Sequence, residues 1–150
     1  MEDIYEYSAD VYKKLGDAIL WTTILAAVHK DGVIEEEERA EAIKQTHIRS
    51  FSTEPYIKPI YEHLDEHFEK DFDTYIKDLP VEYEAKEAYI QAKLADCVAI
   101  LKDMGPVFTA EFSRDLESLF DRVFTANASL FQSFLFPFMT GHLEDKNKRK

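Results

Sequence analysis

A short stretch of the chain, residues 27–38, carries acidic side chains at spacings suited to a divalent cation. In a calcium loop of the EF-hand type, side-chain oxygens occupy the first, third and fifth positions, glycine the sixth and a bidentate glutamate the twelfth. With Gly32 at the sixth position, Asp31 falls at the fifth, Glu35 at the ninth and Glu38 at the twelfth. The candidate metal ligands are therefore Asp31, Glu35 and Glu38.

The first half of such a loop lacks its ligands. Ala27 and His29 stand at the first and third positions, where a complete loop has oxygen-bearing side chains. We therefore expect no more than weak binding of calcium or a similar cation. The alternative is a purely structural turn, in which Gly32 adopts a left-handed conformation and the acids cap the next helix. The residues alone leave both interpretations open.

A second pattern is suited to zinc. Residues 63–67, HLDEH, spell H-x-x-E-H, the pattern of one class of zinc proteases. On a continuous helix His63 and His67 would lie one turn apart and could bind the ion, with Glu66 as general base. Glu144 is a candidate third ligand further along the chain. The apolar spacing places both histidines near the surface, so exposed histidines without a metal are the ordinary interpretation.

Length and charge predict one acidic globular domain. A chain of 150 residues with 45% hydrophobic content can bury a substantial core. Its net charge is −12, and four of its 18 basic residues lie in the last five positions. We expect residues 1–145 to form the domain and residues 146–150 a basic disordered tail. The acidic body should repel nucleic acid and anionic lipid.

Neither end of the sequence indicates membrane insertion or export. The first ten residues are acidic and lack an apolar segment, so we expect no signal peptide. The longest apolar run is short and is broken at Pro137, which predicts no membrane span. Cys97 is the single cysteine, which fits a reducing compartment, and its spacing places it in the core rather than at a catalytic centre. We expect a cytoplasmic location.

Apolar residues recur at helical spacing along most of the chain, which predicts an all-α fold. The spacing holds from Ile4 to Leu15 and again, after Gly16, from Ile19 to Val28, where a buried helix is expected. Further helices are expected at about 35–50, from Thr53-Glu54-Pro55 to about 68, in a short segment ending at Leu79-Pro80, at 81–104, from a cap at Thr109 to 123, and at 127–136.

Two features of the pattern concern packing between elements. Residues 27–34 resemble residues 99–108, with a two-residue insertion in the second copy. Two helical hairpins packed pseudo-symmetrically would explain the repeat, and so would chance. Residues 130–139 have apolar side chains on more than one face. Burial of this segment is favoured over a surface for self-association, and a homo-oligomer remains an alternative.

The stretch from Ile24 to Ile34, followed by Glu38, resembles the A-x-A-x-x-D-G-x-I-x-x-x-E signature of TerB-like proteins, which are named for tellurite resistance. The likeness continues through residues 48–53 and 68–73. It covers residues 15–80 well and residues 85–126 weakly. The resemblance implies about seven helices in two similar halves, each with an Asp-Gly turn. It also implies a role in stress or tellurite resistance, metal binding near the turns and membrane-associated protein partners.

By motif position, the three candidate ligands of the first turn carry over from this resemblance. In the second half only Asp103 and Glu111 match, Met104 stands where glycine is expected, and Pro106 interrupts the pattern. We therefore predict a non-enzymatic accessory protein of a stress response, acting through protein contacts and weak divalent-cation binding. The alternatives are a zinc-dependent hydrolase using the HLDEH motif and a helical adaptor without metal. A position peripheral to a membrane complex is also expected from the resemblance.

Overall fold

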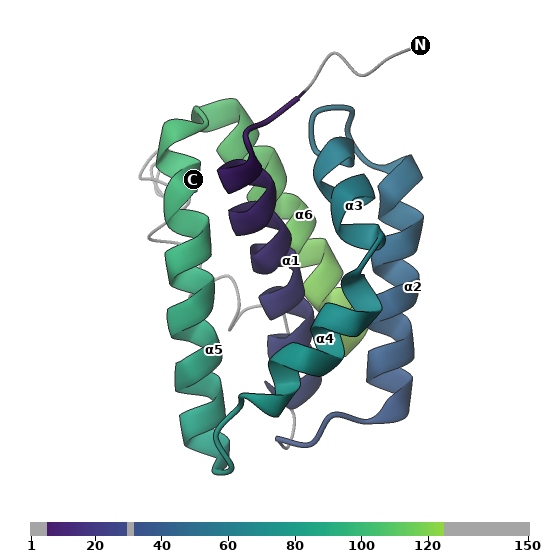
Figure 1. The fold of residues 1–150 in the computed structure, drawn as a ribbon, viewed down its shortest axis with the longest axis vertical. Helices are drawn as coiled ribbons and strands as arrows, with labels where there is room; N and C mark the ends of the chain where they lie inside the picture. The colour runs from purple at the N-terminus through teal and green to yellow at the C-terminus, as the bar shows by residue number, and fades with distance from the viewer. Residues whose placement is uncertain (1–5, 30–31, 125–150) are drawn as a thin grey trace, which may run out of the picture.

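The chain is described by a computed structural model covering residues 6–29 and 32–124, and every regular element in these residues is helical (Figure 1). None of the described helices is long and apolar enough to cross a membrane. The predicted all-α fold is confirmed. The elements, in order, are α1 (Ala9–His29), α2 (Glu36–Ser52), α3 (Lys58–Asp65), α4 (Phe68–Lys77), α5 (Tyr83–Val98), the 3₁₀ helix η1 (Ala99–Asp103) and α6 (Pro106–Phe124).

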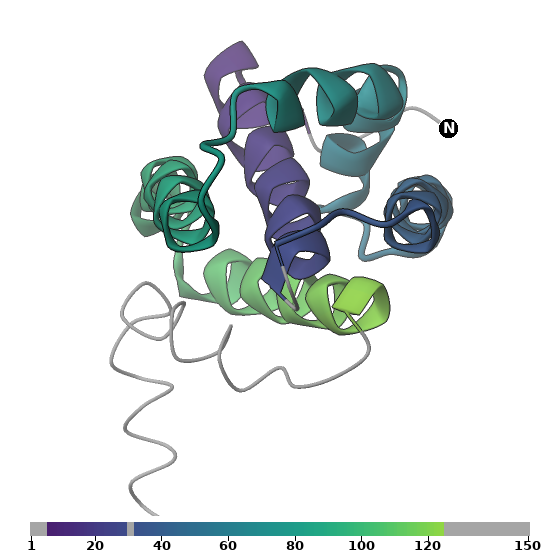
Figure 2. The same cartoon turned by 90° about the horizontal axis from the view of Figure 1, so that it is seen from below.

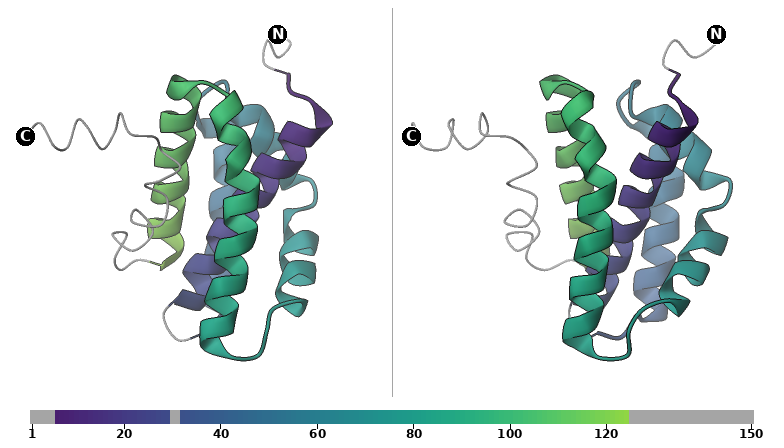
Figure 3. Two further views of the ribbon diagram at one scale, coloured as in Figure 1. Left: turned by 90° about the vertical axis from the view of Figure 1, so that its left-hand side faces the viewer. Right: turned by 60° about the vertical axis from the view of Figure 1, so that its left-hand side comes forward.

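Helix α1 is the centre of the fold. It packs chiefly against α5 and α6 and also contacts α3 and α4. Figures 2 and 3 show α6 on one side of α1 and the α3–α4 pair on the other. Apart from Asp17, every residue from Leu15 to Val28 is buried, as the apolar spacing predicts. The burial of this one helix supplies much of the hydrophobic core.

The stretches of helical spacing before and after Gly16 form one continuous helix. A β-carbon added at Gly16 would lie 3.7 Å from the Cδ1 atom of Leu64, an ordinary contact distance. Glycine is therefore placed where α1 passes close to α3, although the space would also accept a methyl group.

Two predicted boundaries around α3 are wrong. Residues 54–57 form a turn in which the N–H groups of Ile57 and Lys58 donate to the Glu54 carbonyl, so the helix begins at Lys58 rather than near Thr53. Pro59, not Pro55, lies in its first turn. The helix also ends at Asp65, and α4 begins separately at Phe68. Thr53, Glu54 and Pro55 are residue types typical of a helix start, but here they lie in and just before the turn that precedes the helix.

The prediction of Thr109 as a helix cap is also wrong. Helix α6 begins three residues earlier, at Pro106, directly after Gly105. Thr109 is buried within the first turn, and its hydroxyl donates to the Leu101 carbonyl at 2.8 Å. Its side chain thus joins α6 to η1. The predicted long helix 81–104 is present as α5 followed by this 3₁₀ segment.

Both turns of the proposed repeat contain a glycine with positive φ, Gly32 at 81° and Gly105 at 89°. This shared conformation fits the repeat, while the pseudo-symmetric arrangement of hairpins stays a prediction. The described residues contain six α-helices and one 3₁₀ helix, and the expected count of about seven stays a prediction. The expected helix 127–136, the aromatic segment 130–139 and the basic tail lie outside the described residues.

Candidate functional site

The turn between α1 and α2 has the conformation that its glycine predicts. Gly32 has φ of 81°, a region that residues with a β-carbon rarely adopt. Its N–H donates to the Val28 carbonyl at 2.7 Å and so closes the end of α1. Asp31, the first candidate ligand, lies outside the described residues. The left-handed turn predicted at Gly32 is confirmed.

Helix α5 holds this turn in place. The Lys86 ammonium donates to the Gly32 carbonyl at 2.7 Å, and the Tyr83 hydroxyl donates to the His29 carbonyl at 2.6 Å. A β-carbon at Gly32 would lie only 2.8 Å from the Cδ1 atom of Tyr83. Neither Tyr83 nor Lys86 was indicated by the sequence pattern, because each is distant along the chain and has no motif of its own.

His29 occupies the third position of the EF-hand alignment, but its ring is engaged elsewhere. Its Nδ1 atom lies 2.5 Å from a carboxylate oxygen of Glu87. The ring also packs edge-on against Phe120 and Phe124 of α6. His29 therefore links the end of α1 to both α5 and α6.

The two described candidate ligands, Glu35 and Glu38, form a capping box at the start of α2. The Glu35 N–H donates to the Glu38 carboxylate at 3.0 Å, and the Glu35 side chain accepts from the Glu38 N–H. These carboxylates are therefore brought together, and each satisfies a backbone donor of the first turn. The acids also lie where the helix dipole favours negative charge.

Beside this capping box lies a groove between the start of α2 and the end of α6, which we call the acidic groove. Its volume is about 530 Å³. Five carboxylates and one arginine line it, together with two apolar residues: Glu35, Glu37, Glu38, Glu41, Asp121, Arg122, Val123 and Phe124. Asp121 was not predicted as a site residue, since it lies on a helix without any metal motif.

The described part of the chain does not itself assemble a metal cage. Among residues 6–29 and 32–124, no three His, Cys, Asp or Glu side chains are arranged so that they could hold a metal ion. The acidic groove can attract cations electrostatically. A coordinated ion there would need Asp31 or another ligand beyond the described residues.

The HLDEH motif does not form the single helical face that a zinc site of this pattern requires. Helix α3 ends at Asp65, residues 66–67 form a turn, and His67 stands just before α4. His63 stacks on Tyr12 with ring centroids 4.7 Å apart, and the Nδ1 atom of His67 contacts the Asp71 carboxylate. Both histidines are exposed, as predicted. Glu144 lies outside the described residues.

The two matched acids of the second half lie in different surroundings. Asp103 is exposed on η1, whereas Glu111 is half-buried on α6, 3.4 Å from Arg114. Glu111 also lines a second groove between α2 and α6.

Beside this second groove, a buried network joins three helices. Arg49 of α2 donates to Asp115 of α6 at 2.8 Å, and the Tyr61 hydroxyl of α3 donates to the other oxygen of the same carboxylate. The side chains of Arg49 and Asp115 are only 13% and 10% exposed, and Tyr61 is fully buried. Burial, and then the charge of Asp115, raises the pKa of Tyr61 well above its ordinary value.

Cys97 is buried on α5, as predicted. Burial raises the pKa of its thiol from 9.0 to about 12, with nearby Asp17 adding a smaller effect. A thiol in this environment is protonated near neutral pH and is a poor nucleophile. This finding supports a core role for Cys97.

Comparisons of the chain with models of known protein families, with curated proteins and with solved structures give no match. The relation to TerB-like proteins therefore stays a prediction from the residues of the first turn and the segments that follow it.

Proposed function

We propose that this protein acts by binding rather than by catalysis, as a cytoplasmic accessory protein of a stress or tellurite-resistance response. The acidic groove carries the proposal: five carboxylates surround one hollow on a chain of net charge −12. Such a surface favours a basic segment of a partner protein or a cation. The resemblance of the first turn to TerB-like proteins supports the biological role and a membrane-associated partner.

The same proposal includes weak divalent-cation binding at the α1–α2 turn, with Asp31, Glu35 and Glu38 as ligands. The capping box holds Glu35 and Glu38 close together, and Asp31 directly precedes Gly32 in the sequence. Neighbouring carboxylates repel each other, so a hard cation relieves that repulsion. The missing oxygens at Ala27 and His29 limit the expected dissociation constant to about 10⁻⁴–10⁻³ M.

Calcium titration of the melting temperature tests the cation site. A calcium concentration ten times the dissociation constant should stabilise the fold by about 1.4 kcal/mol. The diagnostic variant combines Asp31→Asn with Glu38→Gln. Glutamine at this helix position can still complete the capping box, so this variant should keep its fold and lose the calcium response. Glu66→Gln with Asp78→Asn removes the same charge at two exposed positions outside the groove and should respond like the parent.

Sodium chloride at matched ionic strength separates binding from general screening of the net charge. If calcium stabilises the protein no more than sodium chloride does, or if the Asp31→Asn, Glu38→Gln variant responds like the parent, the turn is purely structural. The protein would then be a helical adaptor without metal.

The protein-contact role has its own test. In cells exposed to tellurite, crosslinked partners of the parent are compared with those of a variant carrying Glu37→Lys, Glu41→Lys and Asp121→Lys. These side chains lie on the groove wall outside the core, so the fold should persist while partner capture falls. Capture of the same partners in equal amounts by this variant would contradict the role of the acidic groove.

A further inference from the structure

A second groove lies between the later part of α2 and α6, and we call it the arginine groove. Its volume is about 600 Å³, which is within the range of small-molecule sites. Three of the four arginines in the described residues line it: Arg49, Arg114 and Arg122. The fourth, Arg39, is engaged by Asp73 and Glu69 of α4. This concentration of guanidinium groups contrasts with the acidic character of the whole chain.

The arginines converge because of helix geometry. Arg114, Ser118 and Arg122 are spaced four residues apart on α6, so they lie along one face, with about 6 Å between successive positions. Arg49 approaches the same face from α2, and its Nη2 atom donates to the Ser118 hydroxyl at 3.2 Å. Ser118 therefore lies midway between Arg114 and Arg122 along α6 and contacts Arg49 of α2.

The carboxylates nearby leave donor capacity in this cluster. Asp115 already accepts from Arg49 and from the Tyr61 hydroxyl, one bond to each oxygen. Glu111 lies 3.4 Å from Arg114, whose side chain is 60% exposed, so their contact is weak. The Nε atom of Arg49 has no hydrogen-bond partner among the described residues, but it is buried, so the donors open to a groove ligand are chiefly those of the exposed Arg114 and Arg122. The Nη2 contact of Arg49 with Ser118 is a long bond to a neutral hydroxyl.

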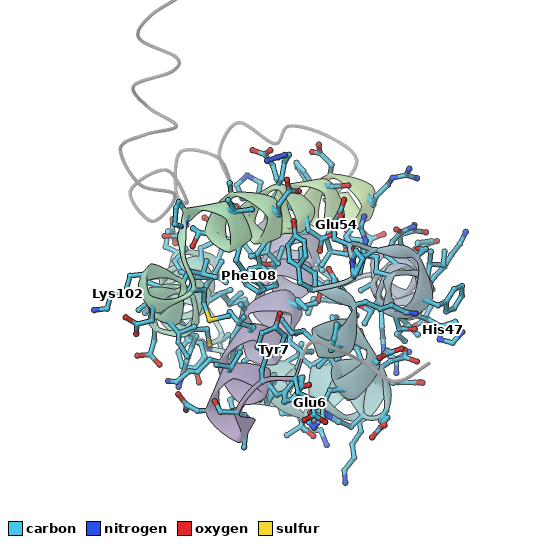
Figure 4. All side chains as sticks on the ribbon, turned by 90° about the horizontal axis from the view of Figure 1, so that it is seen from above. Glu6, Tyr7, His47, Glu54, Lys102 and Phe108 are labelled. Carbon is cyan, nitrogen blue, oxygen red and sulfur yellow. The ribbon has the colours of Figure 1, made fainter. Side chains whose placement is uncertain are left out.

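The rest of the groove is mostly polar. Its apolar lining residues are Ile48, Pro55 and Ile57, of which Ile57 is fully buried. Glu54 adds one carboxylate, and Figure 4 shows it beside α6.

We propose that the arginine groove binds an oxyanion, the phosphate or carboxylate group of a small ligand, next to Ser118 and between Arg49, Arg114 and Arg122. The planar guanidinium fork matches both kinds of oxyanion and forms charge-assisted hydrogen bonds with them. The net charge of −12 repels anions at long range, so anion binding to this protein requires such a local cluster. This site is distinct from the cation site at the first turn, although Arg122 lines both the arginine groove and the acidic groove.

NMR titration with pyrophosphate and, separately, with citrate tests the proposal. The side-chain Nε–H signals of Arg49, Arg114 and Arg122 should shift with either or both anions, while the signal of Arg39 should not. If only pyrophosphate produces the shifts, the ligand carries a phosphate group. If only citrate produces them, the ligand carries a carboxylate group. Sodium chloride at equal ionic strength corrects for screening.

Arg49 belongs to the buried network, so its replacement could disturb the fold. The binding test therefore uses variants of the two exposed arginines. Arg114→Gln and Arg122→Gln should each weaken anion binding about tenfold, the usual effect of removing one charge-assisted hydrogen bond. Lys102→Gln removes one positive charge from η1, which lies outside the groove and, in Figure 4, at the left edge of the molecule away from Glu54; this variant should bind like the parent.

Two results would overturn the oxyanion site. One is the absence of arginine shifts at millimolar concentrations of both anions. The other is equal weakening of binding by Lys102→Gln and by the two α6 variants, which would show a diffuse charge effect instead of a site.

Discussion

The Lys86 ammonium donates a hydrogen bond of 2.7 Å to the carbonyl oxygen of Gly32, fifty-four residues earlier in the chain. The left-handed turn that starts the acidic site is therefore held from outside by α5. Tyr83 of the same helix covers Gly32 so closely that a β-carbon there would lie 2.8 Å from its ring. The turn thus depends on both glycine and the packing of a distant helix.

Replacing Gly32 with alanine should lower the free energy of unfolding by more than about 1 kcal/mol. The alanine would adopt an unfavourable positive φ and would also press on the Tyr83 ring. Gly105→Ala is the matched control, because its φ is also positive but nothing lies within 4 Å of the added carbon. Denaturant unfolding should show a larger loss for Gly32→Ala. Equal losses would mean that Tyr83 yields freely and that α5 does not constrain the turn.

Gly16→Ala should stabilise the protein by about 0.5–1 kcal/mol. Gly16 lies inside α1, where glycine has a conformational entropy cost relative to alanine, and the new methyl group would only touch Leu64 at an ordinary distance. Denaturant unfolding measures the change. A lower stability would show that α1 and α3 approach too closely at this position for any side chain.

Removing Asp115 should be among the most damaging single changes on α6. Asp115→Ala leaves Arg49 charged, buried and without its carboxylate, which typically costs about 3–5 kcal/mol. Tyr61→Phe removes one hydrogen bond to the same carboxylate and should cost about 1–2 kcal/mol. Denaturant unfolding compares the variants. A smaller loss for Asp115→Ala than for Tyr61→Phe would contradict the buried ion pair as the centre of the network.

Alkaline pH should destabilise the fold through Cys97. Burial raises the pKa of its thiol from 9.0 to about 12, so between these values the unfolded thiol is ionised while the folded thiol is protonated. Stability from this group is present below pH 9 and falls by at most about 1.4 kcal/mol per pH unit above it.

Burial also raises the pKa of Tyr75, from 10.0 to about 12, so this tyrosine lowers the stability of the fold in an overlapping alkaline range. A matched variant is therefore needed to isolate the effect of the thiol. Cys97→Ala removes the thiol, and its unfolding free energy should fall less steeply between pH 9 and pH 11 than that of the parent. Parallel curves for the two proteins would show that the thiol is not desolvated.

Changing both histidines of the HLDEH motif to alanine should alter stability by less than about 1 kcal/mol. Both side chains are exposed, and their contacts with Tyr12 and Asp71 lie at the surface. Thermal unfolding and metal analysis of the purified protein measure the effect. Stoichiometric zinc in the parent that is lost in this variant would make the zinc hydrolase the leading function.

Local residue patterns were sufficient for the class of fold and for the first turn. The helical spacing of apolar residues and the near absence of charge from Ile19 to Val28 predict a buried helix, and this stretch is the buried centre of α1. Gly32 predicts a left-handed turn because other residues disfavour that conformation, and the acids after it predict a helix start. These inferences use interactions within a few residues, which the sequence displays directly.

Local patterns did not predict the breaks inside stretches of helical spacing. The HLDEH motif is compatible with one helix, yet the chain turns at residues 66–67. Leu64 and Phe68 are both buried, the first on α3 and the second on α4, on either side of this turn. Thr109 is likewise a residue type typical of helix caps, but it lies inside α6, where its hydroxyl donates to the Leu101 carbonyl of η1.

Only the tertiary structure decided which groups meet at the two grooves. Asp121 joins Glu35 and Glu38 because the end of α6 lies beside the start of α2, and Arg49 faces Ser118 because the same two helices continue past each other. Such encounters depend on packing around α1 and leave no periodicity or spacing in the sequence. The acidic residues of the first turn could therefore be named from the sequence, whereas their neighbours and the arginine groove follow from the arrangement of helices far apart in the chain.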